Sequence, residues 1–281
     1  RMVHRDGSCL SAETSPNVKD LRKNSSEPKK KPRKLMPMSP PLSKAQQTAF
    51  GLSIRITTFY TSIMSLRKNF RHLSESELRL IDENRYEAAF KPGEILVKQG
   101  TPASNALFLA SGIAKKYLEG INGRNFISGI LIPGSPLMGP GAYTGARYTC
   151  SVSALTQVKA CFVSFDVFRK LVRENSLFAE SLIEDLTLQL GNTGQRMVSL
   201  TQKKMAGRLA ELLLHLADDI FGAEEFGMVL SRQEIGDMTN MVKESVVRIL
   251  NSMEKDGLIR ISASRIAIID REKLLFISEN G

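Results

Sequence analysis

Residues 230–259 read LSRQEIGDMTNMVKESVVRILNSMEKDGLI. Ser231, followed three residues later by Glu234, is a capping box, which predicts that a short helix begins here and continues through Met238. Asn240 tolerates the left-handed conformation that a tight turn requires. A second helix follows the turn, and Gly257 is placed to end it. The stretch therefore predicts two short helices joined by a tight turn, a helix-turn-helix.

The second helix is amphipathic and has elements of a wing after it. Its predicted buried face is Val246, Ile249, Leu250 and Met253, and its predicted exposed face is Lys243, Glu244, Val247, Arg248 and Asn251. Two short apolar runs follow at residues 258–261 and 265–269, which is typical of a two-stranded hairpin. Before it, residues 208–218 have the pattern of an amphipathic helix, in which His215 is half-exposed. Together these elements predict a winged helix-turn-helix.

The exposed face of the second helix suits the major groove of DNA. Arg248 can pair with guanine through two hydrogen bonds, Glu244 can accept from the amino group of cytosine, and Val247 can touch a thymine methyl group. Lys243 supplies a single contact to guanine or phosphate, and two polar residues at the start of the first helix would hold the DNA backbone. The predicted DNA-contacting residues are Arg232, Gln233, Lys243, Glu244, Val247 and Arg248.

The charge of the chain leaves an alternative to DNA binding. Residues 1–71 contain 15 Lys and Arg against 4 Asp and Glu, whereas residues 72–281 contain 24 against 25. The net charge of +10 therefore comes from the first quarter of the chain, and residues 201–281 hold 11 basic and 13 acidic residues. A winged helix that binds a protein through a solvated charged face is the alternative. A salt-dependent, sequence-selective gel shift separates the two.

Composition and the first residues bound the architecture further. With 281 residues and 42% hydrophobic content, the chain has room for about two domains. No apolar run approaches the roughly 20 residues of a membrane-spanning helix. We expect residues 1–63, rich in Lys, Pro and Ser, to be a disordered basic tail. Met64 precedes the first well-patterned segment and is a candidate start of the native protein, with residues 1–63 outside it.

Cysteine and histidine usage argues against metal sites and against catalysis. The cysteines lie far apart, which favours a reduced, cytoplasmic setting and provides no zinc-binding pair. Residues 73–214 contain no histidine, so a histidine-ligated metal site or a nucleophile with its histidine cannot be built within them. No phosphate-binding loop motif is present either, and we predict that the protein is not an enzyme. The residues concerned are Cys9, Cys150, Cys161, His4, His72 and His215.

Residues 73–165 change from helix to strands. Ser74 with Glu77 is a second capping box, and the helix it begins extends through Ile81 to Tyr86. Short apolar runs separated by Gly-containing turns then indicate an antiparallel sandwich or roll. Asn122-Gly123 is a hairpin signal. The predicted strands are residues 95–97, 107–109, 114–118, 126–131, 149–154 and 158–163.

After residue 168 the apolar period becomes helical. Apolar residues recur at alternating steps of three and four, which predicts one seam along a helix of about 25 residues. Such a seam favours a partner helix in a homodimer, and packing onto the rest of the chain is the alternative. Gly191 and Gly194 lower helix propensity within it. The seam residues are Ile183, Leu186, Leu190, Met197 and Leu200, with Thr193 among them.

The motif in residues 230–259 resembles the Crp/Fnr family of bacterial transcription regulators. So do the upstream sequences Lys91-Pro-Gly-Glu94, Gln99-Gly100, Ser111-Gly112, Asn122-Gly123-Arg124 and Pro133-Gly134. The resemblance covers residue 73 to the end of the chain. It implies an α+β fold: a sensory β-roll of the cyclic-nucleotide-binding type over residues 64–175, a dimerisation helix over 176–205 and the winged helix-turn-helix over 206–281. It also implies a homodimer that binds a palindromic double-stranded DNA site and acts on RNA polymerase.

The resemblance also identifies departures from the family pattern in the second helix. Glu244 and Arg248 match the family's base-reading residues, whereas Lys243 replaces an arginine. Because lysine lacks the guanidinium fork, we expect relaxed selectivity at that base. Val242 stands where the family often has a serine that caps the helix, which costs about 1 kcal/mol.

The resemblance places an effector pocket in the roll, and this pocket has diverged. Gly139 matches the family, but Pro140 replaces the glutamate that holds the ribose of cyclic AMP. Tyr148-Thr149 replaces the Arg-Ser pair that neutralises the phosphate, and Arg147 is one residue early. Unpaired ribose hydroxyls cost a few kcal/mol, so cyclic AMP is disfavoured. The pocket residues carried over are Gly139, Arg147, Tyr148, Thr149 and Thr193.

The cofactor stays open at this point. Cys9 alone cannot supply the N-terminal cysteines of the family's iron–sulfur sensors. Haem is one alternative, with His72, Cys150, Cys161 or a methionine as ligand. An unknown small molecule, or activity without any effector, is the other.

Overall fold

The computed structural model describes residues 68–135, 143 and 147–281. The predicted basic tail, Met64, Gly139 and Pro140 lie outside these residues. The helical elements are η1 (Lys68–His72), α2 (Glu75–Glu83), η2 (Ile121–Gly123), α3 (Phe165–Glu174), α4 (Ser176–Gln202), α5 (Met205–His215), the π-helix η3 (Leu216–Phe221), α6 (Arg232–Thr239), α7 (Lys243–Lys255) and α8 (Arg271–Asn280). The strands are β1 (Arg85–Phe90), β2 (Ile95–Val97), β3 (Asn105–Ser111), β4 (Ala114–Glu119), β5 (Asn125–Leu131), β6 (Ser151–Ala154), β7 (Val158–Ser164), β8 (Glu225–Gly227), β9 (Ile259–Ser262) and β10 (Arg265–Ile268).

Two antiparallel sheets form the predicted roll. One has the strand order β1-β7-β3 and the other β2-β6-β4-β5. Because side chains alternate along a strand, β3 points Leu107 and Leu109 to the interior of the roll and Ala106 and Phe108 to its outer face. The outer face is covered by the helices, where the rings of Phe108, Phe168 and Phe178 pack together. The strands are therefore apolar on both sides.

Two local predictions in the roll are corrected. The capping box of Ser74 and Glu77 is confirmed, but the helix ends at Glu83 and Tyr86 belongs to β1. There the Tyr86 ring stacks on Phe162 of β7, with ring centroids 4.8 Å apart, so pairing with a distant strand determines its conformation. The β4–β5 hairpin is confirmed, but a 3-10 turn connects its strands, with Gly123 at φ 70°, in place of a two-residue turn.

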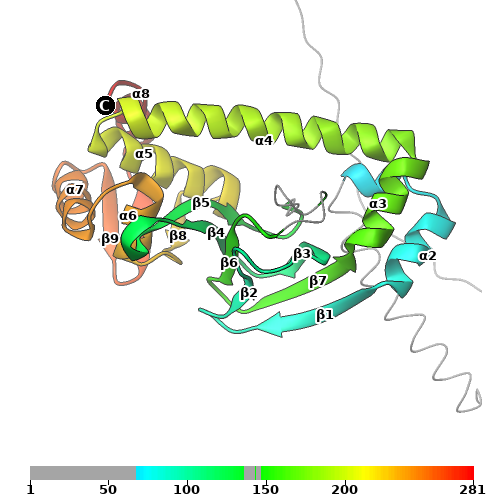
Figure 1. Cartoon of the computed structure of the whole chain (residues 1–281). Helices are drawn as coiled ribbons and strands as arrows, with labels where there is room; N and C mark the ends of the chain where they lie inside the picture. Colours follow the sequence, from blue (N-terminus) through cyan, green and yellow to red (C-terminus); the bar gives the residue numbers. More distant parts are fainter. Residues whose placement is uncertain (1–67, 136–142, 144–146) are drawn as a thin grey trace, which may run out of the picture. The chain divides into compact units, whose positions relative to one another are not determined.

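The long predicted helix is confirmed as α4, one continuous helix of 27 residues (Figure 1). The Asn175 side chain caps its start by accepting a hydrogen bond from the backbone N–H of Phe178 at 2.9 Å. The helix passes through Gly191 and Gly194 without a break. None of the helices in the described part of the chain is both long enough and apolar enough to cross a membrane.

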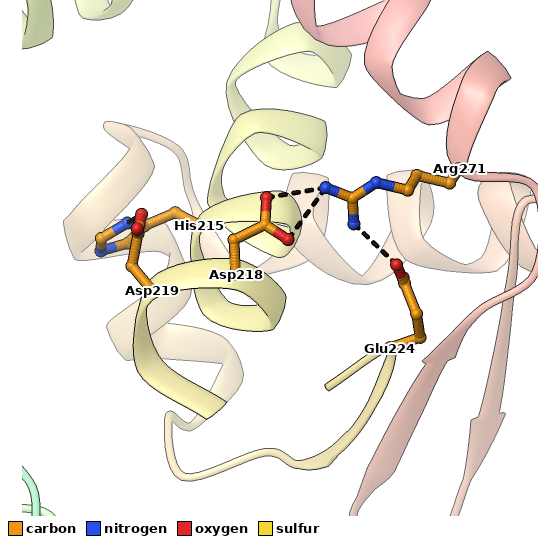
Figure 2. Close-up of polar contacts among 5 residues, drawn as sticks. All are labelled: His215, Asp218, Asp219, Glu224 and Arg271. Carbon is orange, nitrogen blue, oxygen red and sulfur yellow. Dashed lines mark hydrogen bonds and ion pairs between the residues drawn. The ribbon is translucent and has the colours of Figure 1, made fainter. Parts of the chain in front are cut away.

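The C-terminal unit contains two elements that the sequence did not predict. Strand β8 pairs with β10, so the wing belongs to a three-stranded sheet of order β8-β10-β9 rather than a two-stranded one. Helix α8 packs against α5, and its Arg271 reaches Asp218 of η3 at 2.8 Å and Glu224 at 2.8 Å (Figure 2). His215 is confirmed as a half-exposed residue of α5, where its Nδ1 lies 2.7 Å from Asp219 (Figure 2).

Candidate nucleic-acid interface

Helix α6 begins at the predicted capping box. The Ser231 hydroxyl accepts a hydrogen bond from the Glu234 N–H at 3.2 Å, and the Glu234 carboxylate accepts one from the Ser231 N–H at 2.7 Å. Two N–H groups that the helix leaves unpaired at its start are thus satisfied. The buried side of α6 is Ile235, Gly236, Met238 and Thr239.

The turn after α6 depends on two residues. Asn240 has φ 53° and ψ 53°, the left-handed conformation that its side chain type tolerates. Gly236 lies so close to the returning chain that a Cβ there would be 2.5 Å from the Met241 carbonyl oxygen. The Met241 N–H donates to the Gly236 carbonyl at 2.9 Å, which closes the turn. The turn therefore fixes where α7 starts relative to α6.

The close approach at Gly236 leads to a prediction. Replacing Gly236 by alanine should force the two segments apart and lower stability by about 1–3 kcal/mol, seen as a fall in Tm of roughly 2–12 °C in a thermal melt. The matched control is Gly227→Ala, because a Cβ at Gly227 meets nothing within 4 Å. An unchanged Tm in the Gly236→Ala protein would show that the turn can relax at no cost.

Helix α7 presents the predicted polar face to solvent. Val246, Ile249, Leu250 and Met253 are buried, as predicted. Lys243, Glu244 and Arg248 are exposed, and the Val247 side chain is 37% exposed between them. Val242 makes no side-chain hydrogen bond to the start of the helix, so this helix lacks the usual cap. The four predicted base-reading residues therefore share one accessible face.

The charges on this face are available to a ligand. Within the residues that the structure describes, the side chains of Lys243, Glu244 and Arg248 form no hydrogen bond or ion pair. Most other arginines of the C-terminal unit are held by neighbours: Arg271 by two carboxylates, and Arg265 by Glu225 at 2.7 Å. An exposed cation with no internal partner gains most from a phosphate or a base edge.

The residues predicted to hold the DNA backbone are placed at the start of α6. Gln233 is exposed, and its side-chain amide donates to Asp237 at 2.8 Å. Arg232 is half-buried beside it. A further cation that the sequence reasoning missed is Arg260, exposed on wing strand β9. Its signal was a basic residue at a solvent-facing position of the predicted hairpin.

The residues carried over to the effector pocket are only partly brought together. Arg147 donates to the Gly100 carbonyl at 2.6 Å, and the Tyr148 hydroxyl donates to the Asn105 carbonyl at 2.7 Å. Thr149 is exposed beside them, whereas the exposed Thr193 donates within α4, to the Gln189 carbonyl at 2.7 Å. The Tyr148 ring packs with the apolar interior of the roll, and burial raises its pKa. The position thus contributes a ring and a hydroxyl to the roll, not a cation.

The predicted seam on α4 is an exposed apolar strip. Ile183, Leu186, Leu190 and Met197 are 64, 47, 74 and 63% exposed, and Leu200 is half-buried. Isolated exposed apolar residues are common, but a continuous strip along one helix marks an interaction surface. Packing of this strip onto the same chain, the alternative weighed from the sequence, is not what the described residues show.

A β-roll, a long helix with an uncovered apolar strip and a winged helix with a free polar face define the class of DNA-binding regulators that carry a sensory domain. Two family models match this chain: a cyclic nucleotide-binding domain at residues 87–175 and a Crp-like helix-turn-helix domain at residues 207–277. The chain belongs to the Crp/Fnr family of transcription regulators.

Relatives and solved structures agree with this assignment. The chain is 27% identical to the transcriptional activator protein anr of Pseudomonas aeruginosa, covering 66% of this chain and 77% of that protein. It is 24% identical to the CRP-like cAMP-activated global transcriptional regulator of Mycobacterium tuberculosis, covering 73% of this chain and 93% of that one. The structure of FixK2 from Bradyrhizobium japonicum has the same fold, with a TM-score of 0.62, 20% identity and coverage of 69% and 96%.

Proposed function

We propose that this protein is a homodimeric transcription regulator that reads a palindromic site in double-stranded DNA through α7. The observation that carries the proposal is the exposed face of α7, where Lys243, Glu244 and Arg248 have no partner among the described residues. Arg248 pairs with guanine, Glu244 accepts from cytosine, and Val247 contacts a thymine methyl group. Lys243 makes a single contact to guanine or phosphate, which relaxes selectivity at its base.

Contacts outside α7 position the protein on the duplex. Arg232 and Gln233 lie at the start of α6, the helix that crosses the DNA backbone in this motif, and they contact phosphates there. The wing adds Arg260 as a further phosphate contact. These contacts carry no sequence information, so they give salt-dependent affinity for any duplex.

The apolar strip on α4 is the dimer interface of this proposal. Two copies of the strip, related by a two-fold axis, bury the side chains of Leu186, Leu190 and Met197 against each other. A two-fold protein requires a site with matching symmetry, hence a palindrome. In this proposal the sensory roll spans residues 64–175, the dimerisation helix 176–205 and the winged helix 206–281. RNA polymerase is the partner that the bound dimer recruits or blocks.

A salt-dependent, sequence-selective gel shift that is lost in the Arg248→Ala variant tests the proposal. The balanced charge of residues 201–281, with 11 basic and 13 acidic side chains, favours a second candidate, a sensory module whose winged helix binds protein. That candidate predicts no sequence-selective shift with any duplex. We place the protein in the cytoplasm, where its DNA lies, and assign it no catalytic step.

The diverged pocket leads to a prediction on its effector. In calorimetric titrations, cyclic AMP and cyclic GMP should give no saturable heat. Pro140 cannot accept the ribose hydrogen bonds, and Tyr148 cannot neutralise a phosphate. Each lost charged hydrogen bond costs about 1.5–3 kcal/mol, so the affinity should be at least about 100-fold below that of a site with both groups. Saturable binding in the micromolar range would contradict the divergence of the pocket.

The described cysteines do not fit a thiolate-ligated haem. Burial raises the pKa of the Cys150 thiol, and burial raises that of Cys161 to about 11 although Arg85 lies nearby. Both are therefore neutral thiols at pH 7, whereas iron binds the thiolate. Among the described side chains, no group of three histidines, cysteines or carboxylates is arranged to hold a metal ion. An absorption spectrum without a Soret band is the expected result.

A further inference from the structure

Helix α6 is held at its start by a residue of the roll. Lys115 of β4 donates to the Glu234 carboxylate at 2.5 Å, and both side chains are only 20% exposed. Burial alone would raise the pKa of Glu234, but the Lys115 ammonium and the hydrogen bonds from Ser231 lower it below its ordinary value. The carboxylate is therefore charged at neutral pH and joins the helix cap to the roll.

The other end of α6 is held by the long helix. The Arg196 guanidinium of α4 donates to the Met238 carbonyl, one of the last carbonyls of α6. Carbonyls at a helix end have no partner within the helix and carry the negative end of its dipole, so a guanidinium is a favourable partner. Arg196 is half-buried, which shields this contact from solvent.

Apolar packing connects the two polar contacts. Tyr117, Ile127 and Ile130 of β4 and β5 belong to the same hydrophobic core as Ile235 and Met238 of α6. Figure 1 shows α6 next to these strands, with α7 beyond it. Since the turn at Gly236 fixes α7 relative to α6, whatever fixes α6 also fixes the direction of the reading face.

We propose that Lys115 and Arg196 are positioning residues for DNA reading. They hold α6 to the roll and to the dimer helix so that both recognition helices of the dimer meet their half-sites at one spacing. The α7 face is exposed while both contacts are made, so the contacts hold an arrangement that can read DNA. This inference rests on the proposed function, because it needs a dimer that binds two half-sites.

The spacing between half-sites is the property to measure. Each base pair inserted between them moves one half-site by about 3.4 Å and turns it by roughly 35° relative to the other. A rigidly held pair of recognition helices tolerates one spacing, whereas loosely held helices tolerate several. A merely structural role of the contacts would change stability but not the preferred spacing.

The experiment uses the full chain and a palindromic duplex that the wild-type protein selects from a random-sequence pool. Affinity is measured for this duplex, for duplexes with one or two base pairs inserted or removed at the centre, and for a single half-site. Lys115→Met and Arg196→Met should each weaken binding at the best spacing about tenfold and flatten the dependence on spacing. Binding to the single half-site should stay within about twofold, because the reading face is untouched.

Two further variants make the test specific. Lys116→Met removes the neighbouring charge of β4, which forms no ion pair or hydrogen bond through its side chain among the described residues, and should behave as wild type. Lys115→Arg keeps the ion pair with Glu234 and should keep the spacing preference. Equal losses on every duplex, or tighter binding by Lys115→Met, would overturn the inference. If the wild type selects no duplex, the proposed function itself fails.

Discussion

Replacing Arg248 by alanine is expected to abolish sequence-selective DNA binding. A two-hydrogen-bond contact between arginine and guanine is worth about 1–3 kcal/mol of discrimination, and a dimer makes it twice. The affinity for the selected palindrome should therefore fall by at least about 30-fold in a gel shift at fixed salt. Binding to an unrelated duplex should be little changed, since the phosphate contacts are retained.

The matched control for this variant is Arg271→Ala. Arg271 is an exposed arginine of the same C-terminal unit, but Asp218 and Glu224 hold it. Its loss should leave the selected palindrome bound as in the wild type. Sequence selectivity that survives Arg248→Ala would show that another element reads the bases, and loss of all binding to every duplex would show that Arg248 acts on phosphate alone.

Replacing Leu190 by glutamate is expected to convert the dimer to a monomer. Leu190 is the most exposed residue of the seam, 74% accessible in the single chain. Burying a leucine contributes about 1.5–3 kcal/mol, so losing both copies should raise the dimer dissociation constant by at least about 100-fold. Sedimentation over a concentration series measures this change. The monomer should also lose its preference for a palindrome over a single half-site.

Gln195→Glu provides the control for the seam. It introduces the same charge on an exposed position of α4, on a different side of the helix from Leu190. This variant should stay dimeric. Circular dichroism should show unchanged helix content in both proteins, because neither side chain is buried within its own chain. A dimer that persists in Leu190→Glu would place the interface elsewhere.

The sequence predicted the candidate interface well because its signals are local. The capping box of Ser231 and Glu234, the left-handed Asn240 and the apolar period of α7 each act within a few residues. They determine which side of α7 is polar, and the structure confirms that Lys243 and Arg248 are on it. Local signals also located the seam on α4.

Elements that depend on distant pairing were missed. Strand β1 was assigned to the end of a helix because Tyr86 continues the helical period, yet pairing with β7 makes it a strand. Strand β8 is three residues long and exists through its pairing with β10. So short a run has no period of its own, and its partner lies some forty residues away.

The sequence by itself determined the helix-turn-helix, the polar reading face and the apolar seam, since caps, turns and apolar periods are properties of neighbouring residues. Only the tertiary structure decided how the reading unit is held. Lys115 and Glu234 are 119 positions apart, and Arg196 and Met238 are 42 apart. Nothing in the local pattern of either residue indicates its partner, because contacts of this kind arise when separately folded elements pack together.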